Sequence, residues 1–214
     1  MAEVNTMLDK IIEWGAGEAA VRALLLTGSR AVREPADHLA DLDIGVFATS
    51  ITPYLTDDTW IGRLACPWVY SPDRFYFHDT IVPTRLVIYE GGTKVDFSFW
   101  NLGSVERLAA ERYFDTGYKV LLDKDGTLQQ LGPPSFKPAM PPRPSEQAFA
   151  RLVNEYWFEA YHVAKYLYRG DLWLVKFRDS GSLKVYLLTL MEWYALAKHG
   201  WDYDVKWTGK HIRH

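Results

Sequence analysis

Two aspartates one residue apart offer the clearest chemistry in this sequence. Asp41 and Asp43 alternate with the apolar residues Leu42, Ile44 and Val46. This alternation is typical of a strand with one buried face, and it places both carboxylates on the other face, roughly 6 to 7 Å apart along the backbone. Carboxylate oxygens are the ligands that Mg²⁺ prefers, and a bound cation would remove the repulsion between the two acids. An exposed strand with two surface acids would show the same pattern, so that alternative stays open.

A glycine and a serine precede this acid pair. Gly28 and Ser29 directly follow residues 23–26, a continuous apolar run that is typical of a strand buried on both faces. At such a position backbone N–H groups and the serine hydroxyl can approach phosphate oxygens closely, although a simple turn has the same composition. The order of strand, Gly-Ser, short polar stretch and acid-bearing strand therefore predicts a site for a phosphorylated ligand beside a metal ion.

A third acid, Asp96, lies in a later apolar segment. The neighbours at positions 95, 97 and 99 are apolar and are expected to face the core, which turns Asp96 to the other side. An acid in such a strand needs a compensating partner, and a metal site shared with Asp41 and Asp43 supplies one. Three carboxylates suffice for two-metal nucleotidyl transfer, in which a hydroxyl attacks the α-phosphorus of a nucleoside triphosphate and pyrophosphate leaves.

Two cationic side chains are candidates for neutralising the triphosphate. Arg30 directly follows the Gly-Ser pair, and Lys165 lies deep in a helix predicted after a proline-rich segment. A lysine on a solvated helix surface would look the same as Lys165 in the sequence.

The acids need a sheet to position them, and the apolar pattern predicts one. The expected elements are a helix ending near residues 15–17, strands at 23–26, 42–46 and 120–122, a short helix around 53–65, a β-hairpin of 85–89 and 94–99, and a helix over 105–113. The acidic segment 123–126 is predicted to be a turn, because the further ligands of an EF-hand do not follow it.

Proline marks a boundary in the second half of the chain. Six of the thirteen residues from 132 to 144 are proline, a composition that cannot continue a helix or a central strand. We therefore predict a nucleotidyltransferase domain over 1–131, a linker over 132–144 and a helical domain over 145–214. Ser145 can cap a long helix that runs to about residue 169, and a second helix is expected from about 182 to 199. The predicted fold class is α+β, with a mixed β-sheet and flanking helices followed by helices alone.

The amino-acid composition limits the kinds of molecule that the protein is expected to bind. The formal net charge is −3 and no block of Lys or Arg occurs, which argues against a nucleic acid and favours a small, cationic substrate. Cys66 is the only cysteine, so neither an internal disulfide nor a Cys-based zinc site can form within one chain, and a reducing cytoplasm is expected. The N-terminus lacks a signal-peptide pattern and no run is long enough to cross a bilayer, so no membrane partner is expected.

Taken together, these motifs resemble the polymerase-β-like nucleotidyltransferase superfamily and, within it, the aminoglycoside (streptomycin) 6-adenylyltransferase family. The segments that carry the resemblance are Gly28-Ser29-Arg30, Asp41-Leu42-Asp43 and Lys94-Val95-Asp96-Phe97, with collinear matches at 7–12, 57–61, 120–125, 143–145, 154–157, 163–165, 191–194 and 209–210. The resemblance covers nearly the whole chain. It implies ATP as cosubstrate, Mg²⁺ as cofactor, a hydroxyl of an aminoglycoside such as streptomycin as acceptor, and antibiotic resistance as the result. By motif position it gives phosphate and metal roles to Gly28, Ser29, Asp41, Asp43 and Asp96.

The resemblance also bears on the helical domain. Glu155 falls in a segment that is similar to the family's Asn-Glu-aromatic-Trp pattern, which makes it a candidate general base or a ligand for the cationic acceptor. A charged residue on an exposed helix face is the alternative. Members of the family continue through several more helices, so this domain is expected to be incomplete. Apolar helix faces around Leu187, Leu190 and Trp193 would then lack a cover, which favours a homodimer.

Three other functions stay open at this point. The acceptor can be a lincosamide or a protein side chain, since the sequence does not separate acceptors that share one chemistry. The chain can also be a catalytically silent nucleotide-binding relative. A metal-dependent glycosyltransferase uses an Asp-x-Asp pair beside a diphosphate as well, but it needs neither Gly28-Ser29 nor Asp96.

Overall fold

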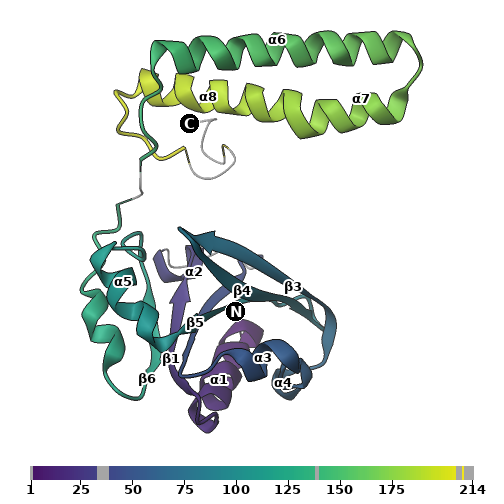
Figure 1. Cartoon of the computed structure of the whole chain (residues 1–214). Helices are drawn as coiled ribbons and strands as arrows, with labels where there is room; N and C mark the ends of the chain where they lie inside the picture. Colours follow the sequence, from purple (N-terminus) through teal and green to yellow (C-terminus); the bar gives the residue numbers. More distant parts are fainter. Residues whose placement is uncertain (1, 33–38, 138–139, 206–208, 210–214) are drawn as a thin grey trace. The chain divides into compact units, whose positions relative to one another are not determined.

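The computed structural model describes residues 2–32, 39–137, 140–205 and 209 of the chain. The chain folds into two compact units, Met1–Lys137 and Pro138–His214, each with its own elements (Figure 1). The first unit combines a β-sheet with helices, and the second is helical in its described part. The predicted α+β fold class is therefore confirmed.

A six-stranded mixed sheet forms the centre of the first unit. Its strands lie in the order β3-β4-β5-β2-β1-β6. Only the β2·β5 pair is parallel among the pairs described, and the remaining neighbours run antiparallel. The strands span β1 (Val21–Thr27), β2 (Leu42–Ala48), β3 (Pro67–Phe77), β4 (Thr80–Tyr89), β5 (Lys94–Asn101) and β6 (Lys119–Asp123).

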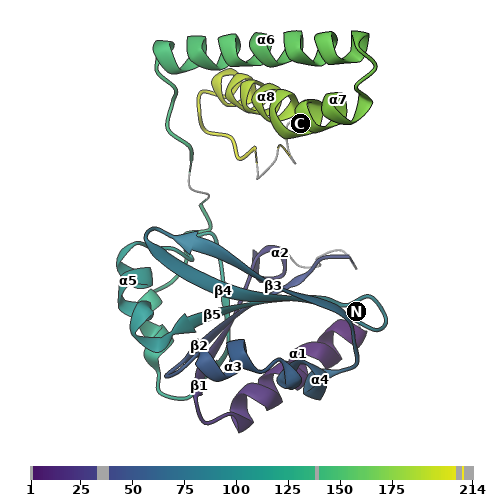
Figure 2. The same cartoon turned by 45° about the vertical axis from the view of Figure 1, so that its right-hand side comes forward.

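Helices cover one face of this sheet. They are α1 (Ala2–Gly17), α3 (Thr52–Thr56) and α4 (Thr59–Leu64), and Figure 2 shows them together on the same side. Leu42, Ile44 and Val46 of β2 turn toward these helices and are almost fully buried, as the alternation predicts. Trp14 of α1 stacks on Trp60 of α4 with ring centroids 5.1 Å apart. This large aromatic core fixes β2 firmly in the middle of the sheet.

A second, smaller core covers part of the opposite face. Phe47 of β2 and Trp100 of β5 stack there with centroids 6.3 Å apart, and Leu108 of α5 (Val105–Ala110) packs against this cluster. Leu128, in the 3₁₀ helix Thr127–Leu131, completes it. Phe47 and Trp100 lie near the ends of β2 and β5, so this core leaves the beginnings of the two strands to other side chains.

The longest strand, β3, was not predicted. It is an edge strand that pairs with β4 over its whole length, and most of its residues are exposed on both faces. Trp68 is 75% exposed and Tyr76 65%. Only its end packs into the core, through Phe75 and the buried Phe77. Most of the strand therefore shows no alternation of buried apolar and exposed polar residues, which explains why the pattern did not reveal it. The partner β4 is also longer than expected, since it begins at Thr80.

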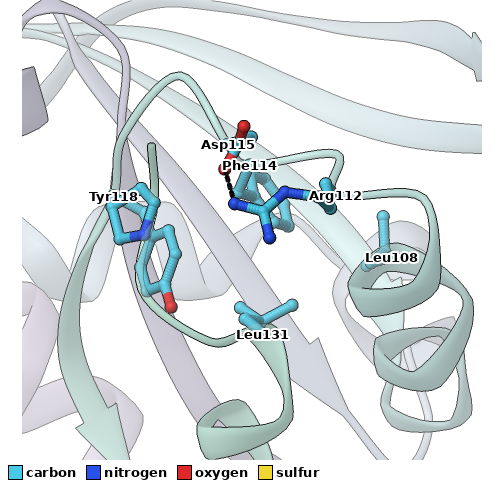
Figure 3. Close-up of a pocket in the computed structure, with 7 residues that line it drawn as sticks. Leu108, Arg112, Phe114, Asp115, Tyr118 and Leu131 are labelled. Atoms are coloured by element: carbon cyan, nitrogen blue, oxygen red, sulfur yellow. Dashed lines mark hydrogen bonds and ion pairs between the residues drawn. The ribbon is translucent and has the colours of Figure 1, made fainter. Parts of the chain in front are cut away.

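Asp115 ties the end of the first unit to its body. Its carboxylate pairs with Arg112 and accepts hydrogen bonds from the hydroxyl and the backbone N–H of Ser135, the latter at 2.8 Å. Its carbonyl oxygen accepts from the Phe136 N–H at 2.8 Å. The contacts border a cavity of about 10 Å³, room for about one water molecule (Figure 3). The cavity is lined by Leu108, Arg112, Phe114, Asp115, Tyr118, Leu131 and Pro134.

These bonds predict a pH dependence of stability. The bonds from Arg112, then those from Ser135, lower the pKa of Asp115 to about 2. The carboxyl group of an unfolded chain titrates near about 3.9, so this stabilisation is complete above about pH 4 and is lost as the pH falls toward the folded pKa. We expect the free energy of unfolding, measured with urea, to fall more steeply between about pH 4 and pH 2 in the wild type than in Asp115→Asn. Equal slopes in the two proteins would contradict this role.

The second unit consists of a long helix and its partners. They are α6 (Glu146–Tyr168), α7 (Leu172–Arg178), a π-helical turn (Asp179–Leu183) and α8 (Lys184–Lys198). The side chain of Ser145 accepts a hydrogen bond from the Ala148 N–H at 3.1 Å, which is the predicted N-cap. Helix α7 was not predicted, because its apolar residues form no buried stripe: Trp173 is 90% exposed and Phe177 75%.

Apolar side chains are widely exposed in this unit. None of the residues of α6 and α7 is buried, and Leu187 on α8 is 40% exposed. Leu190 and Trp193 are partly buried, with Trp193 against Phe149 at 6.3 Å between centroids. Within the described residues, no helix is both long and apolar enough to span a membrane.

Candidate functional site

The register of the sheet brings two of the predicted acids together. Strands β2 and β5 pair in parallel, and Asp43 is the direct partner of Asp96. Their strand neighbours Leu42 and Val95 are also partners and are fully buried on the α1 side. Since side chains alternate along a strand, both acids lie on the other face, on backbones about 4.8 Å apart.

Glycine at position 28 lets the acid of β2 lie against the first predicted motif. Strand β1 also pairs with β2, with Thr27 opposite Asp43, so Gly28 comes directly beside this acid. A Cβ on Gly28 would lie 2.0 Å from Asp43 Oδ2, and the φ of Gly28 is +69°. Both the close contact and the left-handed backbone require glycine. Ser29 follows as the first residue of the short helix α2 (Ser29–Val32) and is exposed.

A lysine that sequence reasoning did not single out joins two of the acids. Lys94 Nζ donates hydrogen bonds to Asp41 Oδ2 at 2.6 Å and to Asp96 Oδ2 at 2.7 Å. These two oxygens are therefore at most two hydrogen-bond lengths apart. Partial burial alone would lower the pKa of Lys94, but the bonds and charges of Asp41 and Asp96 outweigh it and raise the pKa above its ordinary value. The sequence feature that could have revealed this contact is the position of Lys94 two residues before Asp96, which puts both side chains on the same face of the strand.

The acid of β5 keeps one unused oxygen. Asp96 Oδ1 is buried and has no hydrogen-bond partner among the described residues, although a carboxylate oxygen accepts readily. Together with Asp41 and Asp43 it provides the hard oxygen donors that Mg²⁺ takes, and the ammonium of Lys94 shows that a cationic group is accommodated between two of them. The donor chemistry of these residues therefore suits a divalent cation.

The three acids do not form a complete metal cage in this conformation. No group of three His, Cys, Asp or Glu side chains in the described part of the chain is arranged so that it could hold a metal ion. Lys94 lies between Asp41 and Asp96, and Asp43 lies against Gly28. The three acids are neighbours, but the shared site expected from the sequence is not preformed.

Arg30 braces the backbone that leads to the acid pair. Its Nε donates a hydrogen bond to the Ala40 carbonyl oxygen at 2.7 Å. Ala40 directly precedes Asp41, so the bond connects α2 to the start of β2 across residues 33–38, which lie outside the described residues. The structure thus places Arg30 at the predicted site with at least one structural bond.

The remaining two predicted residues belong to the second unit. Glu155 and Lys165 both lie on α6, ten residues and roughly 15 Å of helix axis apart, so the structure does not bring them together. Glu155 accepts a hydrogen bond from Arg151 Nε at 3.0 Å. Lys165 Nζ lies over the ring of Tyr166, 5.5 Å from its centroid. Their roles stay predictions.

Comparison with known proteins decides the family. A family model described as streptomycin adenylyltransferase matches residues 1–214, the whole chain. The chain belongs to the streptomycin adenylyltransferase family. This membership makes the protein an adenylyltransferase, an enzyme that transfers a nucleotidyl group.

Curated relatives agree with this family. An aminoglycoside 6-adenylyltransferase of Bacillus subtilis (strain 168) is 24% identical over 212 residues, which are 96% of this chain and 73% of the relative. A protein of the same name from Staphylococcus aureus is 24% identical over 96% of this chain and 74% of its own length. Among solved structures, the crystal structure of an aminoglycoside 6-adenyltransferase from Bacillus subtilis matches with a TM-score of 0.42 at 20% identity, covering 97% of this chain and 73% of that one.

Proposed function

We propose that the protein transfers AMP from ATP to a hydroxyl group of an aminoglycoside such as streptomycin, releasing pyrophosphate, and so inactivates the antibiotic. Membership of the streptomycin adenylyltransferase family supports this proposal. The structural observation that carries it is the register of β2 and β5, which sets Asp43 beside Asp96 and next to the Gly28-Ser29 turn.

The predicted site residues of the first unit each have a role in this proposal. Asp41, Asp43 and Asp96 would hold Mg²⁺, which neutralises the triphosphate and lowers the pKa of the attacking hydroxyl when bound. The exposed Ser29 and the backbone beside Gly28 would bind phosphate oxygens, because glycine leaves room for a close approach.

Cations and an acid complete the site in the proposal. Arg30 would offset the charge of the triphosphate from the first unit and Lys165 from the second. Glu155 would bind the cationic acceptor or act as general base, and its ion pair with Arg151 is 40% exposed on the glutamate side and therefore easily exchanged for another cation. The net charge of −3 suits a polycationic acceptor.

The proposal also extends to the setting of the enzyme. We place it in the cytoplasm, where ATP is available and the single cysteine needs no oxidising partner. We further propose a homodimer, because large apolar side chains of α6, α7 and α8 are exposed, among them Trp157, Trp173 and Leu187.

A panel of acceptors tests the proposed reaction. The wild type and Asp96→Asn are incubated with ATP, Mg²⁺ and, in separate reactions, streptomycin, other aminoglycosides, a lincosamide and a protein acceptor. Mass spectrometry of the acceptor and release of pyrophosphate are measured. We expect AMP on an aminoglycoside with the wild type, and a loss of roughly a thousandfold with Asp96→Asn. Transfer only to a lincosamide or to protein would show that the aminoglycoside is the wrong acceptor. Transfer to none of the acceptors would overturn the proposal.

One observation favours a catalytically silent nucleotide-binding relative as the second candidate. The ammonium of Lys94 lies between Asp41 and Asp96, in the place that the proposed function gives to a cation. A silent relative would bind ATP, as calorimetry can show, without Mg²⁺-dependent pyrophosphate release with any acceptor of the panel.

A further inference from the structure

Lys94 lies at nearly equal distances from the carboxylates of Asp41 and Asp96. Its ammonium reaches Asp41 Oδ2 and Asp96 Oδ2 at nearly equal distances, 2.6 Å and 2.7 Å, and bridges them. The lysine side chain is 32% exposed, Asp41 39% and Asp96 26%. The ammonium of Lys94 is thus enclosed enough to act as a counter-ion for the two acids, and exposed enough to move away from them into solvent.

Electrostatics explains why a counter-ion is needed there. Two carboxylates on one face repel each other, and the repulsion is stronger at partly buried positions than in water. Asp96 is held by the ladder of β5, but Asp41 directly precedes the first residue of β2 and lies outside that strand. The bond from Lys94 therefore fixes Asp41, the less constrained of the two acids.

The position of the lysine allows it to withdraw. Lys94 is the first residue of β5, directly after a turn in which Gly91 and Gly92 have positive φ angles. Its backbone pairs with Ile88 of β4, and this pairing does not depend on the side chain. The four-carbon stem has freely rotating bonds, so the ammonium can leave without disturbing the sheet.

We propose that Lys94 is a positioning residue whose ammonium holds Asp41 and Asp96 together in the metal-free protein and competes with a divalent cation for the same two oxygens. The inference rests on the proposed function, because it assumes that these acids bind the metal. An ammonium and a metal ion cannot occupy one place. The apparent metal affinity is therefore reduced by the fraction of molecules in which Lys94 fills the site.

Two readouts that do not require turnover test this inference. Thermal unfolding is measured in the presence of a chelator, and binding of Mn²⁺ alone is measured by electron paramagnetic resonance. In Lys94→Met we expect the unfolding midpoint to fall by about 2–4 °C, because two acids lose their counter-ion. We expect Mn²⁺ to bind about tenfold more tightly, because its competitor is gone.

Two variants serve as controls for Lys94→Met. Lys94→Arg keeps a cation between the acids, so the midpoint should stay close to that of the wild type and Mn²⁺ should bind no more tightly. Lys10→Met removes an exposed lysine of α1 in the same unit and should change neither quantity.

The outcomes separate this inference from the proposed function. If Asp96→Asn weakens Mn²⁺ binding but Lys94→Met leaves it unchanged or weaker, the metal site stands and the role of Lys94 is wrong. If Asp96→Asn has no effect on Mn²⁺ binding, the metal site is wrong, and both the proposed function and the role of Lys94 fall. Tighter binding and a lower midpoint in Lys94→Met, with neither in Lys10→Met, support the competition.

Discussion

Asp43→Asn is expected to reduce AMP transfer by roughly a thousandfold while the protein stays folded. Asparagine has nearly the same shape as aspartate but lacks the charge that a divalent cation requires. The residue is only partly buried, and the strand around it is held by Leu42 and Ile44 in the core, so the change acts on the site and not on packing. Rates at saturating ATP and acceptor, together with the unfolding midpoint, measure both effects.

Asp73→Asn provides the matched control for this change. Asp73 is an exposed acid of β3 in the same unit, and its conversion removes one negative charge without touching β2 or β5. The activity of this variant should remain within about twofold of the wild type. Full activity in Asp43→Asn would show that the metal site has been assigned to the wrong residues.

Gly28→Ala is expected to reduce activity by roughly a hundredfold and to destabilise the protein by about 1–2 kcal/mol. The new Cβ would lie 2.0 Å from Asp43 Oδ2, so the carboxylate or the turn must move. The φ of +69° adds strain for any residue with a side chain. Because displacements of about 1 Å strongly reduce catalysis, the loss should appear in kcat as well as in the KM for ATP.

Gly62→Ala separates this effect from the general effect of adding a methyl group. Gly62 lies in α4, and a Cβ there would meet nothing within 4 Å. Alanine in a helix is favoured over glycine, so this variant should be more stable by roughly 0.5–1 kcal/mol and equally active. Equal activity in Gly28→Ala and Gly62→Ala would contradict the contact between Gly28 and the acid.

The sequence predicted those strands that pack into the core. In β2 and β5 the apolar residues Leu42, Ile44, Val95 and Phe97 turn into the core, and this alternation is visible without coordinates. Helix α7 has no buried residue and most of β3 is exposed, as Trp173 and Trp68 show, so neither element follows a clear period over its length. Such elements are defined by pairing with a neighbour or by chain connectivity, which a local pattern does not contain.

The candidate site was predicted in its residue types but not in its contacts. Alternation correctly set Asp43 and Asp96 on the face opposite the buried core. Their pairing depends on the parallel register of two strands that are far apart in the sequence, and no local rule gives this register. The bridge from Lys94 to Asp41 depends on the same register and was missed for the same reason.

A crystal structure of the protein with Mn²⁺ and a non-hydrolysable ATP analogue would test the central claim most directly. Anomalous scattering locates the metal independently of the surrounding model. We predict a metal ion bonded to carboxylate oxygens of Asp41, Asp43 and Asp96, with the ammonium of Lys94 moved away from Asp41. Metal bound elsewhere, or an analogue bound while Lys94 still bridges the two acids, would contradict this prediction.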